Sequence, residues 1–244
     1  MDALSRDGDG VATEPLGPPP PALLLREWPR AAATLVRLAG ARARLRSAPR
    51  GDGRPILLLP GLFNSDRSNG VLRRFLVASG YRAEGWGLGR NFGSRTIGGD
   101  AARLIARVEA MAVETSAPVT LIGVSLGGIM ARLVAHRRPE LVREVVTVSS
   151  PFAGHPRATN VWRAFEWITG ERVDSPEVDT LRAEIAAPLP VPATAIWSAS
   201  DGMVNGLACR DEHGRSIEVR SGHLAVQLNP DVLVVIAEVL AGER

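Results

Sequence analysis

The stretch Val119-Thr-Leu-Ile-Gly-Val-Ser-Leu-Gly-Gly128 carries the pattern G-x-S-x-G around Ser125. The apolar, β-branched run before the serine predicts a buried strand, and residues 126–136 have the 3.6-residue spacing of a helix. The glycines beside Ser125 have no side chains, so strand and helix can approach closely through a sharp turn that exposes the serine hydroxyl. The pattern therefore predicts a nucleophile elbow. The alternative is a glycine-rich turn with a capping serine.

An acid and a histidine follow further along the chain, each directly after a strand-like run. Asp201 follows residues 193–198, and His223 follows residues 216–220. A serine hydroxyl is a poor nucleophile at neutral pH, so it needs a base within hydrogen-bond reach, and that base needs a carboxylate to fix its tautomer. These positions favour the elbow over the capping serine. We expect Ser125 to act as nucleophile, His223 as base and Asp201 as the orienting acid.

Other acids and histidines fit these roles less well. Asp66 precedes a predicted helix, where it is more simply a cap, and Asp174 lies inside an irregular segment. His136 closes a helix, where its charge favours the helix dipole, and His213 lies in a polar turn. His155 lies at the start of segment 152–191 and could reach the expected pocket, although a lone histidine in a loop is usually just solvated.

Strand-like and helix-like runs alternate from residue 55 onward. Continuous apolar runs such as Ile56-Leu-Leu-Leu59 are typical of strands whose two sheet faces are covered by helices. Strands that alternate with helices imply a parallel sheet with right-handed crossovers. We therefore expect an α/β fold with a mostly parallel central sheet flanked by helices. The expected strands are residues 56–59, 81–86, 119–124, 144–148, 193–198 and 216–220, and the expected helices are 68–79, 100–115, 126–136 and 230–240.

With these segments in place, the sequence resembles the α/β-hydrolase superfamily in its compact bacterial lipase and esterase branch. The resemblance covers about residues 55–240 and includes the order Ser, Asp, His along the chain. It implies the α/β-hydrolase fold and a serine hydrolase that forms an acyl-enzyme on Ser125. Its specific parts are Leu58-Leu-Pro-Gly61, Gly123-Val-Ser-Leu-Gly127, Ser200-Asp-Gly-Met-Val204 and Gly222-His223.

The resemblance also implies an oxyanion hole made of two backbone N–H groups. Leu126, directly after the nucleophile, supplies the first. Alignment of Pro60-Gly-Leu with the His-Gly-x of many relatives makes Leu62 the second, with Phe63 as the alternative. Pro60 stands where the family has histidine, so this loop lacks one identifying residue.

Residues 152–191 interrupt the alternation of strands and helices and are the candidate for a small helical lid. Val161, Trp162, Phe165 and Ile168 share one face of a short helix. Ligands of α/β sheets bind at the carboxyl ends of the strands, where this segment begins, so we expect part of this apolar face to line a pocket. The alternative is that the face packs the segment onto the domain. The expected pocket residues are Phe63, Phe92, Phe152, Trp162 and Phe165.

An apolar pocket favours a small hydrophobic acyl substrate, and an esterase or lipase-like enzyme that cleaves a hydrophobic carboxylic ester. The same triad also serves thioesterases, amidases and acyltransferases, and a few members of the superfamily bind small molecules without catalysis. The sequence sets neither the acyl chain length nor the oligomeric state.

The chain before residue 55 divides into two parts. Residues 1–25 are rich in Gly, Pro and Asp and are expected to form a disordered tail. Residues 26–54 hold eight Arg against Glu27 and Asp52, a local charge of +6, and are expected to form a basic amphipathic helix over about 29–47 and a linker. This helix either packs on the domain with its arginines in solvent or meets anionic lipid. Residues 55–244 form the hydrolase domain.

Composition argues against several other classes of protein. The net charge is only +3 and the basic residues outside 26–54 are balanced by acids, so no nucleic-acid partner is expected. The chain contains no Lys, which excludes Schiff-base chemistry on a lysine, and Cys209 is its only cysteine, which excludes an intrachain disulfide. The glycine-rich loop 87–93 matches no phosphate-binding pattern, so no nucleotide site is expected, and a single cysteine cannot form a cysteine-based metal site. No cofactor and no metal are expected. Neither a secretion leader nor a membrane span is apparent, which favours the cytoplasm.

Overall fold

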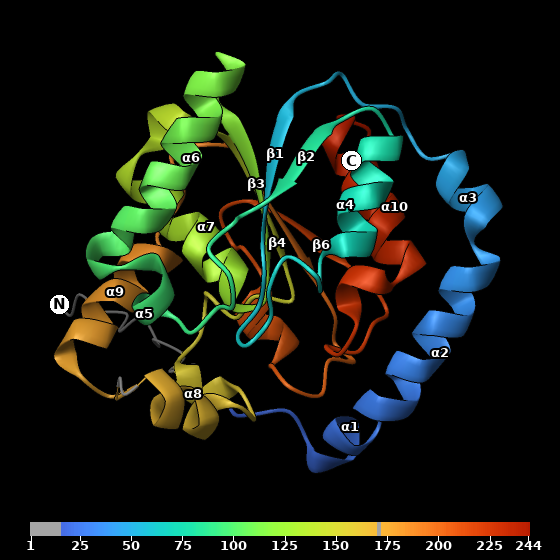
Figure 1. Cartoon of the computed structure of the whole chain (residues 1–244). Helices are drawn as coiled ribbons and strands as arrows, with labels where there is room; N and C mark the ends of the chain where they lie inside the picture. Colours follow the sequence, from blue (N-terminus) through green and yellow to red (C-terminus); the bar gives the residue numbers. More distant parts are fainter. Residues whose placement is uncertain (1–15, 170–171) are drawn as a thin grey trace, which may run out of the picture.

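Six parallel strands form the centre of the molecule in a computed structural model that describes residues 16–169 and 172–244 (Figure 1). The strand order is β2-β1-β3-β4-β5-β6, and each neighbouring pair in this sheet runs parallel. The prediction of a parallel sheet flanked by helices is confirmed. The strands are β1 (Pro55–Leu59), β2 (Arg82–Gly85), β3 (Val119–Val124), β4 (Val142–Val148), β5 (Ala193–Trp197) and β6 (Arg215–Glu218).

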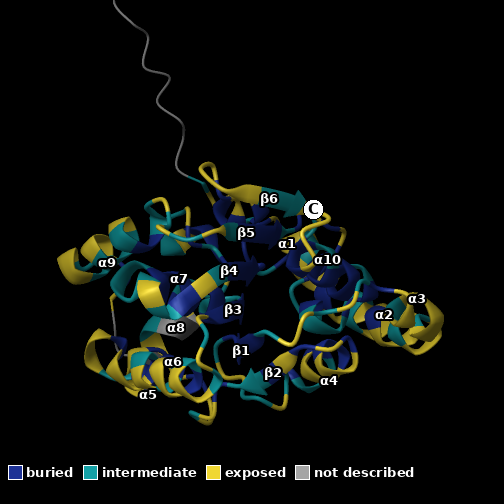
Figure 2. Cartoon of the chain, turned by 90° about the horizontal axis from the view of Figure 1, so that it is seen from above, coloured by how far each residue is buried: buried dark blue, intermediate teal, exposed yellow. Residues whose placement is uncertain are grey.

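Helices cover both faces of the sheet and bury β1 and β3 along their whole length (Figures 1 and 2). Ile56 and Leu58 of β1 pack with α4 and α10, whereas Leu57 and Leu59 pack with α6 and α7. All four side chains are fully buried, and each contributes about 1.5–3 kcal/mol to folding. Burial on both faces explains the continuous apolar run. The flanking helices are α4 (Gly70–Ala78), α5 (Ser94–Ile97), α6 (Ala102–Thr115), α7 (Leu126–Arg137), α9 (Pro176–Ala186) and α10 (Pro230–Leu240).

Short 3-10 helices lie in several connections. They are η1 (Gly99–Ala101), η2 (Pro139–Leu141), η3 (Pro156–Ala158), η4 (Gly206–Cys209) and η5 (Val226–Leu228).

Three helices precede the sheet, of which α2 and α3 lie along the outside of α10 and α1 lies at the bottom of the view (Figure 1). They are α1 (Pro21–Leu25), α2 (Glu27–Gly40) and α3 (Arg42–Arg46), and Arg37 and Arg44 pair with Asp231 of α10 at 2.5 Å. The expectation of a disordered tail over residues 1–25 is wrong for residues 21–25, which form α1. The helix can begin at a proline because Pro21 occupies the first helical position, where no N–H is needed. Residues 1–15 of that expectation lie outside the described residues. The single predicted basic helix is divided at Ala41, after the weak helix former Gly40.

The segment 152–191 connects β4 to β5 and contains η3, α8 (Trp162–Thr169) and α9. The buried side chain of Arg132, on α7, binds the C-terminal part of segment 152–191 to the domain. The guanidinium donates at 2.7 Å to the carbonyls of Ile185 and Ala187 and pairs at 2.7 Å with Asp211. Its Cζ also lies 3.9 Å from the ring centre of Phe152. Burial lowers the pKa of Arg132, and the Asp211 carboxylate opposes that effect.

Replacing Asp211 with Ala should destabilise the protein strongly, because it leaves the Arg132 guanidinium buried without a counter-charge. We expect a loss of about 3–5 kcal/mol of unfolding free energy, measured by urea denaturation. Asp179→Ala is the control, since it breaks only the exposed pair of Asp179 with Arg182 and should cost less than about 1 kcal/mol. Equal losses in the two variants would contradict this account of the buried pair.

Candidate active site

Ser125 occupies a sharp turn between β3 and α7, with φ 52° and ψ −122°. Such a backbone conformation costs a non-glycine residue about 1–3 kcal/mol and persists only where the surroundings enforce it. Here the enforcement is contact between backbones. A Cβ on Gly123 would overlap the backbone of Gly127, and a Cβ on Gly127 would overlap the carbonyl of Leu59. The missing side chains let α7 lie directly against the ends of β1 and β3, which projects the Ser125 side chain from the turn.

The structure brings Ser125, His223 and Asp201 into one chain of hydrogen bonds. His223 Nε2 lies 3.1 Å from Ser125 Oγ, and His223 Nδ1 lies 2.7 Å from Asp201 Oδ2. Asp201 follows β5 and is buried, while its second oxygen accepts from the backbone N–H groups of Met203 and Val204 at 2.9 Å. These bonds hold the carboxylate so that one oxygen remains for the histidine. The geometry matches that expected of a nucleophile, a base and an orienting acid.

The rival carboxylates have other partners and do not contact His223. Asp66 accepts from the backbone N–H groups of Trp86 and Gly87, so it ties the end of β2 and is not the helix cap that its position suggested. Asp174 pairs with Arg157. His155 lies 3.5 Å from the same Asp174 and belongs to that surface group.

His223 has a raised pKa relative to its usual value of 6.5. Burial of the imidazole favours its neutral form and acts against this shift. The negative charge and the hydrogen bond of Asp201 outweigh the burial, and the charge of Glu27 adds to them. The imidazolium that forms when a base accepts the serine proton is therefore stabilised in this site.

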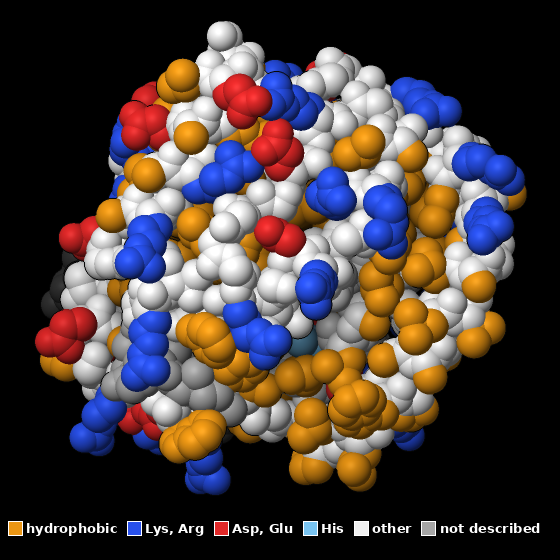
Figure 3. All heavy atoms as spheres, viewed as in Figure 1, with side chains coloured by type: hydrophobic (Ala, Val, Ile, Leu, Met, Phe, Trp, Pro, Cys, Tyr) orange, Lys and Arg blue, Asp and Glu red, His pale blue; other side chains and the backbone are white. Residues whose placement is uncertain are grey.

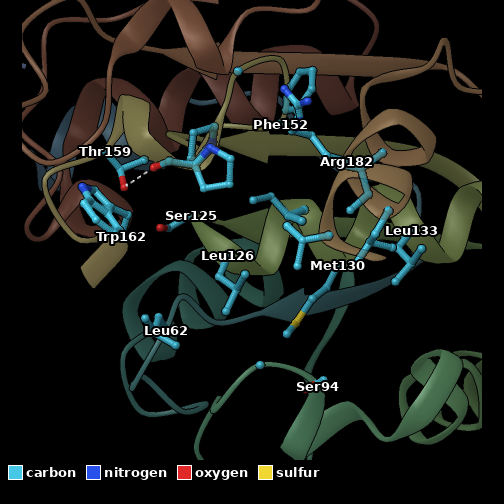
Figure 4. A pocket seen from close by; sticks show the side chains of 18 of the residues that line it. Leu62, Ser94, Ser125, Leu126, Met130, Leu133, Phe152, Thr159, Trp162 and Arg182 are labelled. Atoms are coloured by element: carbon cyan, nitrogen blue, oxygen red, sulfur yellow. Dashed lines mark hydrogen bonds between the residues drawn. The ribbon is translucent and has the colours of Figure 1, made fainter. Parts of the chain in front are cut away.

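The predicted oxyanion-hole residues Leu62 and Leu126 lie on the same side of Ser125 in Figure 4. Leu126 is the first residue of α7, so its N–H has no intrahelical acceptor, and Leu62 follows β1. The N–H of Phe63 donates to the carbonyl of Asn91 at 2.8 Å and is therefore occupied. This bond favours Leu62 over Phe63 as the second donor.

Asn91 holds the Leu62 loop, a role that sequence reasoning missed. Its side chain is fully buried and donates to the carbonyl of Pro60 at 2.7 Å, while its backbone N–H donates to Asn64 at 2.8 Å. Its side-chain oxygen accepts from the N–H of Gly93 at 3.0 Å. The only local signal was an asparagine within the glycine-rich loop 87–93.

A largely apolar cavity of about 650 Å³ opens beside Ser125. In Figure 4, Ser125 and Trp162 lie at one end and Leu133 at the other. The helix α7 forms one wall through side chains that recur at helical spacing, and segment 152–191 forms the opposite wall. The apolar lining residues include Leu62, Ile97, Leu126, Ile129, Met130, Leu133, Phe152, Val161, Trp162, Val178, Leu181, Ile185 and Val204.

Phe152 and Trp162 are predicted pocket residues that line the cavity. Phe63 and Phe92 do not line it. Their rings pack edge to face with centres 6.2 Å apart, and each is over a third exposed. The backbone of Phe63 has a positive φ of 63°. The side chain of Phe165 lies outside the part of the chain that the structure describes.

Within residues 16–169 and 172–244, no group of three or more His, Cys, Asp or Glu is arranged to hold a metal ion. In the same ranges, no helix combines the length and the apolar character needed to cross a membrane. Cys209 is buried, and this burial strongly raises the pKa of its thiol.

The profile of the alpha/beta hydrolase fold family matches residues 100–205. That match includes the serine elbow and Asp201. The chain has the α/β-hydrolase fold. No relative is found among curated protein sequences.

Solved structures with the α/β-hydrolase fold match most of this chain at low sequence identity. A Bacillus licheniformis lipase, BlEst2, is 16 % identical, with a TM-score of 0.60, and the match covers 80 % of this chain and 94 % of the lipase. A monoacylglycerol lipase of Paleococcus ferrophilus is 15 % identical, with a TM-score of 0.58, over 79 % of this chain and 97 % of that one. The thioesterase domain of the curacin biosynthetic pathway is 14 % identical, with a TM-score of 0.52, over 79 % and 93 %. At sequence identities this low, the structural similarity establishes a shared fold alone.

Proposed function

We propose that this α/β-hydrolase-fold protein is a serine hydrolase that cleaves hydrophobic carboxylic esters through an acyl-enzyme on Ser125. The observation that supports the proposal most directly is the chain of hydrogen bonds from Ser125 through His223 to Asp201, together with the apolar cavity that Ser125 lines. A nucleophile, a base and an acyl-binding surface thus meet at one point. The lipases among the structural neighbours agree with this choice of substrate class.

In the proposed reaction, Ser125 Oγ attacks the ester carbonyl carbon as its proton passes to His223 Nε2. The N–H groups of Leu62 and Leu126 stabilise the negative charge on the carbonyl oxygen, and Asp201 stabilises the imidazolium. The C–O bond to the alcohol then breaks, and His223 returns the proton to the leaving oxygen. Water activated by the same histidine attacks the acyl-enzyme, which releases the carboxylic acid and frees Ser125.

The acyl chain lies along α7 in this proposal. Leu126 and Leu133 are separated by two turns of helix, or about 10 Å, and both line the cavity. Each methylene buried there contributes about 0.8 kcal/mol, or roughly fourfold in affinity, until the cavity is filled. Segment 152–191 covers this channel as a lid in the proposal.

Thioesters, amides and acyl acceptors other than water remain alternatives on the same triad, and one structural neighbour is a thioesterase domain. A protein that binds a small hydrophobic molecule without catalysis is the alternative from a different class. Rates over a panel of matched esters, thioesters and amides distinguish all of these, since only the binding protein would leave every substrate intact.

Ser125 should react covalently with a fluorophosphonate, because its hydroxyl lies 3.1 Å from His223 Nε2. We expect intact-mass spectra to show one adduct on the wild type and none on Ser125→Ala, and hydrolysis of a p-nitrophenyl ester to fall at least about a thousandfold in that variant. Ser94→Ala, which changes another cavity serine, should label normally. Labelling of Ser125→Ala, or none of the wild type, would contradict the assignment.

Substitutions at Leu133 should change the preferred acyl chain length in opposite directions. Leu133→Trp fills the far end of the cavity and should lower kcat/KM for long-chain esters by at least about tenfold, while short esters are hydrolysed as before. Leu133→Ala enlarges that end and should move the optimum to longer chains. Thermal unfolding checks that both variants are folded. Parallel losses on all chain lengths would place the acyl chain elsewhere.

The N-terminal helices also present an apolar surface beside basic residues, visible at the lower right of Figure 3. We propose that this surface meets anionic lipid. Leu25, Trp28 and Val36 are each at least 75 % exposed. Arg37 and Arg44 share the single carboxylate of Asp231, which offsets only one unit of the local positive charge, so the apolar side chains and the remaining arginines both contribute to the proposed attraction.

Co-sedimentation with phosphatidylglycerol vesicles at low and high salt tests this lipid contact. We expect Trp28→Ser to weaken binding at least about fivefold because an exposed indole is lost from the interface. Val113→Ser removes an equally exposed apolar side chain from α6 and should bind as the wild type does. Absence of wild-type binding at either salt concentration would exclude the contact.

A further inference from the structure

Glu27 is a buried carboxylate that joins the two loops of the candidate site. It is the first residue of α2 and only 1 % exposed. Its Oε1 accepts from the N–H of Gly202 at 2.7 Å, and its Oε2 accepts from the N–H of Leu224 at 2.8 Å. Gly202 directly follows Asp201, and Leu224 directly follows His223. One carboxylate therefore fixes the distance between the acid loop and the histidine loop.

Both loops carry a glycine where the N-terminal helices approach them. A Cβ on Gly202 would overlap the carbonyl of Leu23 in α1, and a Cβ on Gly222 would lie 2.8 Å from Glu27 Oε2. Arg30, one turn further along α2, donates to the carbonyl of Ser200 at 2.5 Å. The loops are thus shaped to receive α1 and α2 closely.

We propose that Glu27 is a positioning residue of the active site, which holds Asp201 and His223 in register and places a second negative charge behind the imidazole. This inference rests on the proposed hydrolase function. Glu27 does not line the cavity, so it acts on the reaction through His223 and the two loops.

The charge of Glu27 is not cancelled by an ion pair. Among the described residues, no arginine or histidine forms a salt bridge with it, and its partners are backbone N–H groups. Arg30 of the same helix binds the Ser200 carbonyl, and Asp231 of α10 is occupied by Arg37 and Arg44. Each backbone donor is met by one carboxylate oxygen, which a glutamine amide cannot reproduce because its N–H₂ group is itself a donor, so the carboxylate both joins the loops and leaves a negative charge behind His223.

The effect of that charge on His223 has a defined sign. The titratable groups that face His223 are Asp201, after β5, and Glu27, on α2, and both favour the imidazolium against the opposing effect of burial. The nearby Cys209 thiol is neutral because burial raises its pKa. Removing the Glu27 charge should therefore lower the pKa of His223, and the acidic limb of the pH-rate profile should move to lower pH.

The test compares Glu27→Gln with the wild type by NMR titration of the His223 imidazole and by the pH dependence of ester hydrolysis. Gln retains the volume, loses the charge and turns an N–H₂ group toward one of the two backbone donors. We expect the pKa to fall by at least about 0.3 unit, a twofold change in proton affinity. We also expect kcat to fall on the order of tenfold with little change in KM, because the loops lose their register while the cavity is unchanged.

Two further variants separate positioning from general stability. Asp231→Asn loosens the contact of α2 and α3 with α10 without touching the active-site loops, so it should lower the melting temperature and leave the pKa of His223 as in the wild type. Glu27→Asp keeps the charge but reaches only one of the two donors. It should therefore retain most of the rise in the pKa of His223 and still lower kcat.

A wild-type pKa in Glu27→Gln, or an equal pKa shift in Asp231→Asn, would overturn the proposal. The NMR titration requires no turnover, so it separates this inference from the proposed function. If the wild type cleaved no ester, thioester or amide, the hydrolase assignment would fail, while a lowered His223 pKa in Glu27→Gln would still support the electrostatic part of the inference. If Glu27→Gln did not fold, Glu27→Asp would be the deciding variant. A lowered kcat would support the proposal, and a wild-type kcat would overturn it.

Discussion

The candidate site depends on a contact in which two backbones meet with no side chain between them. Gly123 and Gly127 let the first turn of α7 lie against the ends of β1 and β3, and every other feature of the site is arranged around the serine that this contact projects. The buried sheet supplies the rigidity that keeps Ser125 at a positive φ. The loops after β1, on one side of β3, and after β5 and β6, on the other side, then converge on that fixed point.

Most of the fold and the three central residues could be predicted because their signals are local. Strands buried on both faces produce continuous apolar runs, and an elbow requires glycines at fixed offsets from its serine. Asp201 and His223 follow strands, so chain order alone placed them at the same edge of the sheet. The hydrogen bonds of Asp201 and His223 then agree with what that order suggested.

The remaining features have no local signal. Glu27 reaches partners 175 and 197 residues away, and an isolated glutamate in a basic stretch shows nothing of this. Phe63 and Phe92 were reasonable pocket residues by position, but the direction of a side chain in a loop depends on the backbone turn, which the sequence does not display. The helix α1 was missed because a proline-rich segment argues against helices, although a proline is tolerated at a first helical position.

The start of α2 connects the outside of the molecule to its interior across one peptide bond. Glu27 is buried against the active-site loops, and its neighbour Trp28 is 77 % exposed. A surface that held Trp28 and shifted the helix would also shift the carboxylate behind His223. Thermodynamic linkage makes such coupling reciprocal, so a ligand bound in the cavity would change the affinity of α2 for that surface by the same factor by which the surface changed the affinity of the cavity for the ligand.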